Sequence, residues 1–210
     1  MDHVWGRPIL APIAAGPYRS HHIYQRVFSA AQCRRIIALG ERLDPGQSLL
    51  ESGDGREVAD DTIRRSGVGW IAPTDESWWI FDKLGAVAER ANGRYGFDLT
   101  GFGEDLQFTV YDEPGAFYSW HQDGLDGEVA SRKLSMVVQL SDPETYVGGE
   151  LEFFDVDEDL GEDDLAAFTA LSIRQGAVIV FPSFEYHRVR PIRSGVRHSL
   201  VAWVSGPPFR

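Results

Sequence analysis

The chain has 210 residues, of which 43% are hydrophobic and 12% aromatic, and this composition excludes a wholly disordered protein. Its formal net charge of −12 disfavours nucleic acid as a partner, because an acidic surface repels a phosphate backbone. A single cysteine, Cys33, excludes an internal disulfide and favours a reducing compartment. Since we find neither a secretory signal nor an apolar run of membrane-spanning length, we expect a cytoplasmic protein with no membrane partner.

Two amphipathic helices are expected in the first half of the chain. Ser29-Ala-Ala-Gln32 reads as a capping box, and the helix after it should end at Gly40 or at the Asp44-Pro45 break. A second helix should begin at Thr74 or Asp75 and end at Asn92-Gly93, with an apolar stripe between these points.

The segment Gln47–Asp61 is rich in glycine, serine and acidic residues, which predicts an exposed, mobile loop. Together with Arg64-Arg65-Ser66 it is a candidate lid over a site formed elsewhere in the chain. Whether this loop takes part in substrate binding is left open.

The pattern changes after Phe102 to short runs rich in β-formers, separated by turn residues. The expected strands are Leu106–Tyr111, Ala116–His121, Leu134–Leu140, Glu150–Phe154, Leu171–Ile173, Ala177–Phe181, Glu185–Val189 and Arg197–Val204. Because no helix lies between them, they predict an antiparallel sandwich or jelly roll, and thus a mainly β (α+β) fold. We expect one domain over 1–210, with 1–100 as helical support and a lid, and 101–210 as the catalytic core.

His121-Gln-Asp123 is the first pair with metal-binding chemistry. Residues two apart on a strand point to the same face, so the imidazole and the carboxylate would share one space. Two histidines and one carboxylate on one side of an iron ion leave open positions for oxygen chemistry. An isolated pair of this kind also arises by chance as a turn hydrogen bond.

A second histidine and an arginine strengthen this interpretation. His187 follows 64 residues later in another expected strand, where a structural role in the core is the alternative. In the strand from Arg197, the alternate residues Arg197, Ser199 and Trp203 face the same side and suit a carboxylate ligand. A surface position for Arg197 is disfavoured by its apolar strand.

These residues together resemble the prolyl-4-hydroxylase-like branch of the iron(II)/2-oxoglutarate dioxygenases, especially the bacterial PKHD-type hydroxylases. The family's pattern of HxD, a distal histidine and a basic residue about ten positions later reads here as His121-Gln-Asp123, His187 and Arg197. The flanking segments are similar as well: Gln107–Tyr111, Leu134–Pro143, Gly148–Leu151 and Gly176–Pro182.

The resemblance implies a double-stranded β-helix that binds Fe(II), 2-oxoglutarate and O2. His121, Asp123 and His187 would be the metal ligands, and Arg197 would bind the distal carboxylate of 2-oxoglutarate with help from Ser199. Further candidates near the cosubstrate are Tyr111, Gln139 and Trp203, although Tyr111 and Trp203 would serve equally well as core residues. Relatives often carry a tyrosine where Gln139 stands, so its role is open.

The implied reaction is hydroxylation of an unactivated C–H bond. A prolyl or similar residue in a peptide or protein is the favoured substrate, and a free amino acid or small metabolite is the alternative. A nucleic-acid demethylase is disfavoured by the charge, and a non-enzymatic metal-binding β-roll remains a rival interpretation. A homodimer is compatible with the sequence.

The acidic run Asp155–Asp164 does not fit a calcium-binding loop, because Leu160 stands at the glycine position and Ala166 at the position of the bidentate glutamate. A solvated loop between strands is the favoured interpretation. The alternative is that it borders the pocket and attracts a cationic substrate.

Overall fold

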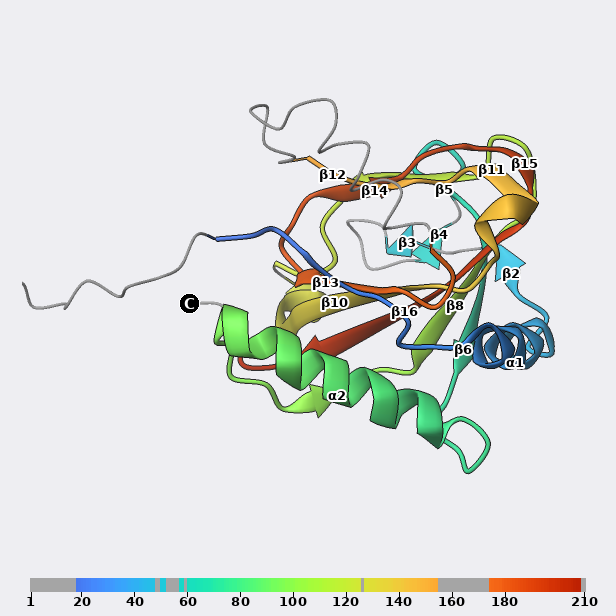
Figure 1. The fold of residues 1–210 in the computed structure, drawn as a ribbon. Coiled ribbons are helices and arrows are strands. Elements are labelled where there is room, and N and C mark those ends of the chain that lie inside the picture. The colour runs from blue at the N-terminus through green and yellow to red at the C-terminus, as the bar shows by residue number, and fades with distance from the viewer. Residues whose placement is uncertain are drawn as a thin grey trace, which may run out of the picture.

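The computed structural model describes residues 18–47, 50–51, 57–58, 60–125, 127–154 and 174–208. An antiparallel major sheet forms the centre of the fold, with strand order β1-β13-β10-β16-β8-β6-β2 and with β7 paired to β16 (Figure 1). Its strands are β1 (His22–Tyr24), β2 (Gly46–Gln47), β6 (Gly67–Ile71), β7 (Gly101–Phe102), β8 (Leu106–Tyr111), β10 (Arg132–Gln139), β13 (Val178–Pro182) and β16 (Arg197–Ser205).

A smaller antiparallel sheet with the order β12-β14-β9-β5 faces the major sheet, as Figure 1 shows above it. Its strands are β5 (Arg64–Arg65), β9 (Phe117–His121), β12 (Leu151–Phe153) and β14 (His187–Val189). Two further strand pairs are β11 (Tyr146–Gly148) with β15 (Ile192–Gly195), and β3 (Leu50–Glu51) with β4 (Glu57–Val58). Short 3-10 turns span Gly127–Ser131 and Pro143–Thr145. The expected mainly β fold is confirmed.

Helix α1 (Ala30–Glu41) begins as its capping box predicts. The Ser29 hydroxyl accepts from the Gln32 amide at 3.2 Å, and the Gln32 side chain accepts from the Ser29 amide at 3.0 Å. Both bonds satisfy backbone donors that the first turn leaves without a helical partner. The helix extends one residue past Gly40 and ends before the Asp44-Pro45 break.

The predicted ends of the second helix are wrong. Helix α2 spans Trp78–Tyr95, so it starts later than Thr74 or Asp75 and runs through Asn92-Gly93. Gly96 ends it instead, because this residue adopts the left-handed conformation at φ 73° and its amide donates to the Asn92 carbonyl. The Asn92 side chain forms hydrogen bonds with the backbone of Phe97, so it stabilises the chain just after Gly96 and does not itself end the helix.

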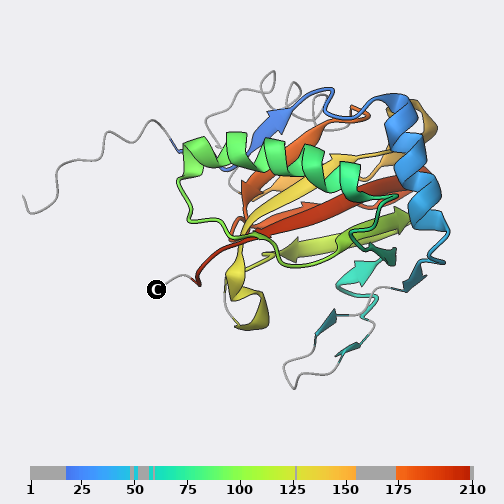
Figure 2. The same ribbon diagram turned by 90° about the horizontal axis from the view of Figure 1, so that it is seen from below.

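The main hydrophobic core lies between the two helices and one face of the major sheet, and Figure 2 shows both helices crossing that face. Alternate strand residues such as Phe108, Met136 and Leu200 meet α1 and α2 residues such as Ile36 and Leu84, and all five are fully buried. Burying this apolar surface is the dominant stabilising contribution to such a fold. The helices therefore support the sheet from the side opposite the smaller sheet.

Of the eight expected strands, seven overlap observed strands, and β8 matches Leu106–Tyr111 at both ends. The expected strand Leu171–Ile173 and the acidic run Asp155–Asp164 lie outside the described residues. The first hundred residues supply more than the expected helical support, because β1 and β6 join the major sheet and β5 joins the smaller one. The Gln47–Asp61 segment is described only in part, with its short strands β3 and β4 paired to each other.

In the part of the chain that the structure describes, no helix is both long and apolar enough to cross a membrane.

Candidate metal centre and cosubstrate pocket

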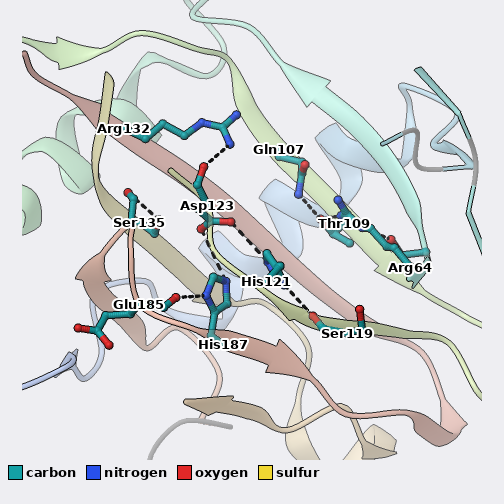
Figure 3. A network of polar contacts seen from close by, with 12 residues as sticks. Arg64, Gln107, Thr109, Ser119, His121, Asp123, Arg132, Ser135, Glu185 and His187 are labelled. Carbon is teal, nitrogen blue, oxygen red and sulfur yellow. Dashed lines mark hydrogen bonds and ion pairs between the residues drawn. The ribbon is translucent and has the colours of Figure 1, made fainter. Parts of the chain in front are cut away.

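Three potential metal ligands converge between the two sheets. His121 ends β9 and His187 begins β14, and the two residues are direct partners across the antiparallel pair. Their Nε2 atoms face the Asp123 carboxylate, at 3.4 Å for His121 and 3.7 Å for His187 (Figure 3). Their ligand atoms all lie within 4.8 Å of one another, so three side chains that are distant in sequence share one point in space.

Asp123 reaches this point by a route that differs from the expected strand alternation. Strand β9 ends at His121, and Asp123 lies beyond it. Its amide donates to the Ser183 carbonyl at 2.9 Å, and its own carbonyl accepts from Arg132 Nη1 at 3.0 Å. These main-chain bonds, and not a pleated strand, hold the carboxylate beside the imidazoles.

Both histidines are held in the tautomer that metal binding needs. Nδ1 of His121 lies 2.8 Å from the Ser119 carbonyl oxygen, and Nδ1 of His187 lies 2.9 Å from that of Glu185. Because a carbonyl oxygen can only accept, each Nδ1 must carry the proton in these bonds. These second-sphere bonds fix the ring orientation and turn each Nε2 toward Asp123, and in a neutral ring of this tautomer Nε2 carries the lone pair that binds a metal.

Burial lowers the pKa of His187 to about 4, although the nearby Asp123 carboxylate opposes the shift. The imidazole is thus neutral near pH 7. Burial also disfavours the charged form of Asp123, but the two neighbouring histidines outweigh it and lower the pKa of the carboxyl group. At neutral pH the site presents one carboxylate and a neutral imidazole at His187, which is the protonation state of metal ligands.

Arg197 lies on the major sheet with its side chain almost fully buried, at 1% exposure. Its Nη2 donates to Gln139 Oε1 at 2.9 Å and its Nη1 to Ser199 Oγ at 3.3 Å. The Tyr111 ring lies 5.3 Å from the guanidinium carbon. Among the described residues no carboxylate pairs with Arg197, and its Nε has no hydrogen-bond partner. A buried guanidinium with only neutral partners suits an incoming carboxylate.

The glycine pair that opens the family-like segment Gly148–Leu151 makes room for this arginine. Gly149 has φ 70°, and a Cβ atom there would lie 2.7 Å from Arg197 Cδ and 2.5 Å from Ile192 Cδ1. A larger residue would meet both a conformational penalty and a collision with the buried side chain. The Gly148-Gly149 turn therefore belongs to the framework of the pocket.

One cavity of about 350 Å³ joins the metal-ligand cluster to Arg197. Tyr111, Ser199 and Trp203 line it as expected, while Gln139 contributes through its bond to Arg197. The indole of Trp203 is covered by the Arg132 guanidinium at 3.8 Å, and its Nε1 has no hydrogen-bond partner among the described residues. The structure thus brings all eight predicted site residues together around one space.

Sequence reasoning assigned no site role to several lining residues, among them Tyr118 and Arg132, and it placed Arg64 only in a candidate lid. Tyr118 stacks on His121 with ring centroids 3.5 Å apart, and burial raises the pKa of its hydroxyl to about 12. Arg132 and Arg64 also line the cavity. The alternation of β9 could have placed Tyr118 near the site, but the two arginines reach the cavity through contacts with distant strands that no local pattern reveals.

Comparison with known proteins gives a consistent picture. Residues 106–205 match the family model described as the 2OG-Fe(II) oxygenase superfamily. A PKHD-type hydroxylase of Synechococcus sp. (strain CC9902) is 36% identical over 92 residues, which cover 44% of this chain and 37% of that protein. The chain therefore aligns with less than half the length of the curated relatives it matches.

Solved structures with a similar fold cover most of the chain. A Pseudomonas putida prolyl-4-hydroxylase matches with a TM-score of 0.64 and 23% identity, over 90% of this chain and 93% of that one. A Trichoplax adhaerens prolyl hydroxylase, solved with a peptide fragment of hypoxia inducible factor, matches with a TM-score of 0.69 and 16% identity, over 89% and 83%. At such identities the likeness establishes the fold, which is the double-stranded β-helix expected from the sequence.

Proposed function

We propose that the chain is an Fe(II)- and 2-oxoglutarate-dependent dioxygenase that hydroxylates an unactivated C–H bond, and that it is a member of the 2OG-Fe(II) oxygenase superfamily, whose model residues 106–205 match. One observation carries this proposal: a largely buried two-histidine, one-carboxylate cluster shares a single cavity with a buried arginine that has no carboxylate partner among the described residues. The first feature suits iron, and the second suits the far end of a dicarboxylic acid.

His121, Asp123 and His187 hold the iron in this proposal. The chemistry of the donors fits, because Asp123 Oδ2 is buried with no hydrogen-bond partner in the described part of the chain. A buried carboxylate oxygen is costly unless something neutralises it, and a divalent cation would do so. Bound Fe(II), with 2-oxoglutarate and O2, supplies the oxidising chemistry that no amino-acid side chain provides.

Arg197 anchors the distal carboxylate of 2-oxoglutarate, with Ser199 and Gln139 orienting its guanidinium. Tyr146 lies close to Arg197, and the guanidinium opposes the rise that burial causes in the pKa of its hydroxyl. Tyr111 packs beside the guanidinium and limits its movement. In this proposal 2-oxoglutarate would lie between the arginine and the metal ligands.

The surrounding side chains serve by positioning and by excluding water. The stacked ring of Tyr118 holds His121 in place, and Phe181 packs against His187 at a centroid distance of 4.6 Å. Apolar residues of the cavity, such as Val137 and Leu151, keep the reacting atoms away from bulk solvent. The chain thus supplies geometry and shielding, while the cofactor supplies the reactivity.

A prolyl or similar residue in a peptide is one substrate class for this site. It is supported by structural neighbours described as prolyl hydroxylases, one of them solved with a peptide fragment. A free amino acid or other small metabolite is favoured by a different observation, the 350 Å³ volume of a cavity that must also hold 2-oxoglutarate. Ordinary ligand pockets range from about 300 to 1,000 Å³, so little of this space remains for a second molecule.

The test is an anaerobic calorimetric titration of the purified chain with Fe(II) and then 2-oxoglutarate, followed by admission of O2 and measurement of succinate. We expect one iron per chain, 2-oxoglutarate binding that depends on the metal, and succinate formation after O2 enters. A protein that binds iron but never consumes 2-oxoglutarate with any peptide or amino acid offered would be the non-enzymatic metal-binding β-roll. Failure to bind iron would refute the proposal.

A further inference from the structure

A third guanidinium of the cavity has no role in the proposed reaction. Arg64 lies on β5 at the edge of the smaller sheet, is 6% exposed, and lines the same cavity as the metal-ligand cluster. Arg132 and Arg197 are the other two arginines of this cavity. Three buried or half-buried cations in so small a space require partners, because desolvating an uncompensated charge is costly.

The charges of the other groups balance without Arg64. The Glu104 carboxylate neutralises Arg132 through contacts with both Nε and Nη2. The negative charge of Asp123 and the positive charge of Arg197 sum to zero. The charges of a divalent iron and a dianionic 2-oxoglutarate also sum to zero, so these four groups together carry no net charge. Arg64 alone is left over, as a cation buried within the pocket that the proposed ligands do not neutralise.

The described neighbours of Arg64 are all neutral. Its Nε donates to Ser66 Oγ at 2.8 Å and its Nη2 to Thr109 Oγ1 at 3.5 Å, as Figure 3 shows in part. Its guanidinium lies over the Tyr118 ring at 4.6 Å. In the part of the chain that the structure describes, no Asp or Glu oxygen lies within 4.0 Å of it. Hydroxyl and ring contacts fix the direction of the side chain without neutralising its charge.

Arg64 lies close to the proposed metal site. The Tyr118 ring contacts the guanidinium on one side and is stacked on His121 at 3.5 Å. Arg64 is therefore separated from a proposed iron ligand by one aromatic ring. Arg197 lies on the other sheet, with Ser199 next to Thr109 across the β8–β16 pair. An anion on Arg64 would lie in the same cavity as 2-oxoglutarate but on a different arginine.

We propose that Arg64 binds a carboxylate of the primary substrate and so orients the C–H bond to be hydroxylated. This inference rests on the proposed function. The free N–H groups of the guanidinium form the charge-assisted bonds, while Ser66 and Thr109 hold the fork in place. The carboxylate can come from a free amino acid, or from the C-terminus of a peptide. The small cavity favours the free acid.

The experiment measures binding of matched acid and amide probes by calorimetry. The protein is loaded with Mn(II) and N-oxalylglycine, which occupy the metal and cosubstrate positions without turnover. The probes are the standard L-amino acids, acetyl-capped dipeptides, and the C-terminal amide of each. We expect at least one acid to bind roughly tenfold or more tightly than its amide, because a charge-assisted bond is lost in the amide. Preference for free amino acids identifies the small-molecule source, and preference for capped dipeptides the peptide source.

Three variants test whether Arg64 itself, and not a neighbouring residue, causes the preference for acid over amide. Arg64→Gln should abolish the preference for acid over amide, and Arg64→Lys should retain part of it, since a lysine keeps the charge but loses the fork. Arg65→Gln is the matched control, because Arg65 is the next residue of β5, is exposed, and lines a different groove. It should keep the wild-type preference. Absence of any acid preference in the wild-type protein, or its survival in Arg64→Gln, would overturn the inference.

The same titrations distinguish failure of this inference from failure of the proposed function. If the wild-type protein binds no Mn(II) or no N-oxalylglycine, the proposed function itself fails. If both bind equally well to wild type and Arg64→Gln but no acid preference exists, only the role of Arg64 is wrong. If Arg64→Gln loses N-oxalylglycine, Arg64 belongs to the cosubstrate site and the inference is overturned.

Discussion

The two faces of the major sheet are equally buried but are stabilised in different ways. On the helix side, Phe108, Met136 and Leu200 pack against apolar neighbours and need nothing more. On the cavity side of the same strands, Thr109, Ser199 and Arg197 place polar atoms in the interior. The buried polar atoms that lack partners among the described residues are Asp123 Oδ2, Tyr146 Oη, Arg197 Nε and Trp203 Nε1. One face is complete by packing, and in our proposal the other is completed by ligands.

Removing a proposed ligand should have the largest effect on the cavity side. We expect Asp123→Asn to lower Fe(II) affinity by more than about 100-fold, since even outer-sphere partners of ligands contribute about 10–100-fold. Turnover of 2-oxoglutarate should fall to background, and metal-free stability should not decrease, because the native carboxylate is buried with an unpaired oxygen. Iron titration and urea unfolding of the variant measure both quantities. Unchanged iron affinity would remove Asp123 from the site.

The helix side should respond to packing alone. Leu200→Ala should lower the free energy of unfolding by about 2–5 kcal/mol, the range for a buried leucine truncation. Binding of 2-oxoglutarate to the iron-loaded variant should change little at temperatures where it remains folded. Urea unfolding and calorimetry separate the two effects. The neighbouring Ser199→Ala should instead weaken binding of 2-oxoglutarate while changing the free energy of unfolding little. Identical behaviour of the Leu200→Ala and Ser199→Ala variants would contradict the division between the two faces of the sheet.

Arg197→Gln should act mainly on the cosubstrate. Losing a charge-assisted pair of about 1.5–3 kcal/mol predicts roughly 10–100-fold weaker binding of 2-oxoglutarate, with iron affinity retained. Calorimetric titration of the iron-loaded variant measures this directly. An unchanged 2-oxoglutarate affinity would refute the assignment.

The helix cap offers a smaller test that is remote from the cavity. Ser29→Ala removes one half of the capping box and should lower the free energy of unfolding by about 1 kcal/mol. Iron and 2-oxoglutarate affinities should be unaffected. A change in either affinity in the folded variant would show that the helical layer does more than support the sheet.

A further test concerns pH and does not involve the proposed ligands. Burial lowers the pKa of His21 to about 4, with His22 and Arg19 contributing, while its ring stacks on Phe153 at 4.7 Å. Between pH 6.5 and 4 the folded state therefore binds fewer protons than the unfolded state, and stability falls as pH falls through this window. His21→Phe should reduce the drop in melting temperature between pH 7 and pH 5. An equal drop would show that His21 does not contribute.

Much of this organisation is readable from the sequence because it depends on local pattern. The alternation in the strand from Arg197 separates its pocket residues from its core residues, and the capping box at Ser29 marks the start of α1. The grouping of His121 with His187 as candidate metal ligands follows from two strand assignments and the family pattern. These features needed no knowledge of the tertiary structure.

The remaining features depend on contacts between segments distant in sequence. Gly96, and not Asn92-Gly93, ends α2, since sequence signals do not decide between nearby glycines. Asp123 is placed by a backbone bond to Ser183, sixty residues away in the chain. Arg64 becomes a cavity residue only because β5 joins β9 and its side chain reaches Thr109 on the facing sheet. No window of sequence contains both partners of such contacts.

The most direct test of the central claim is a crystal structure of the chain grown anaerobically with Mn(II) and N-oxalylglycine. We predict one metal ion bound by His121 Nε2, His187 Nε2 and the Asp123 carboxylate, with the distal carboxylate of the analogue on Arg197. A metal ion bound elsewhere, or an analogue whose distal carboxylate avoids Arg197, would contradict the account.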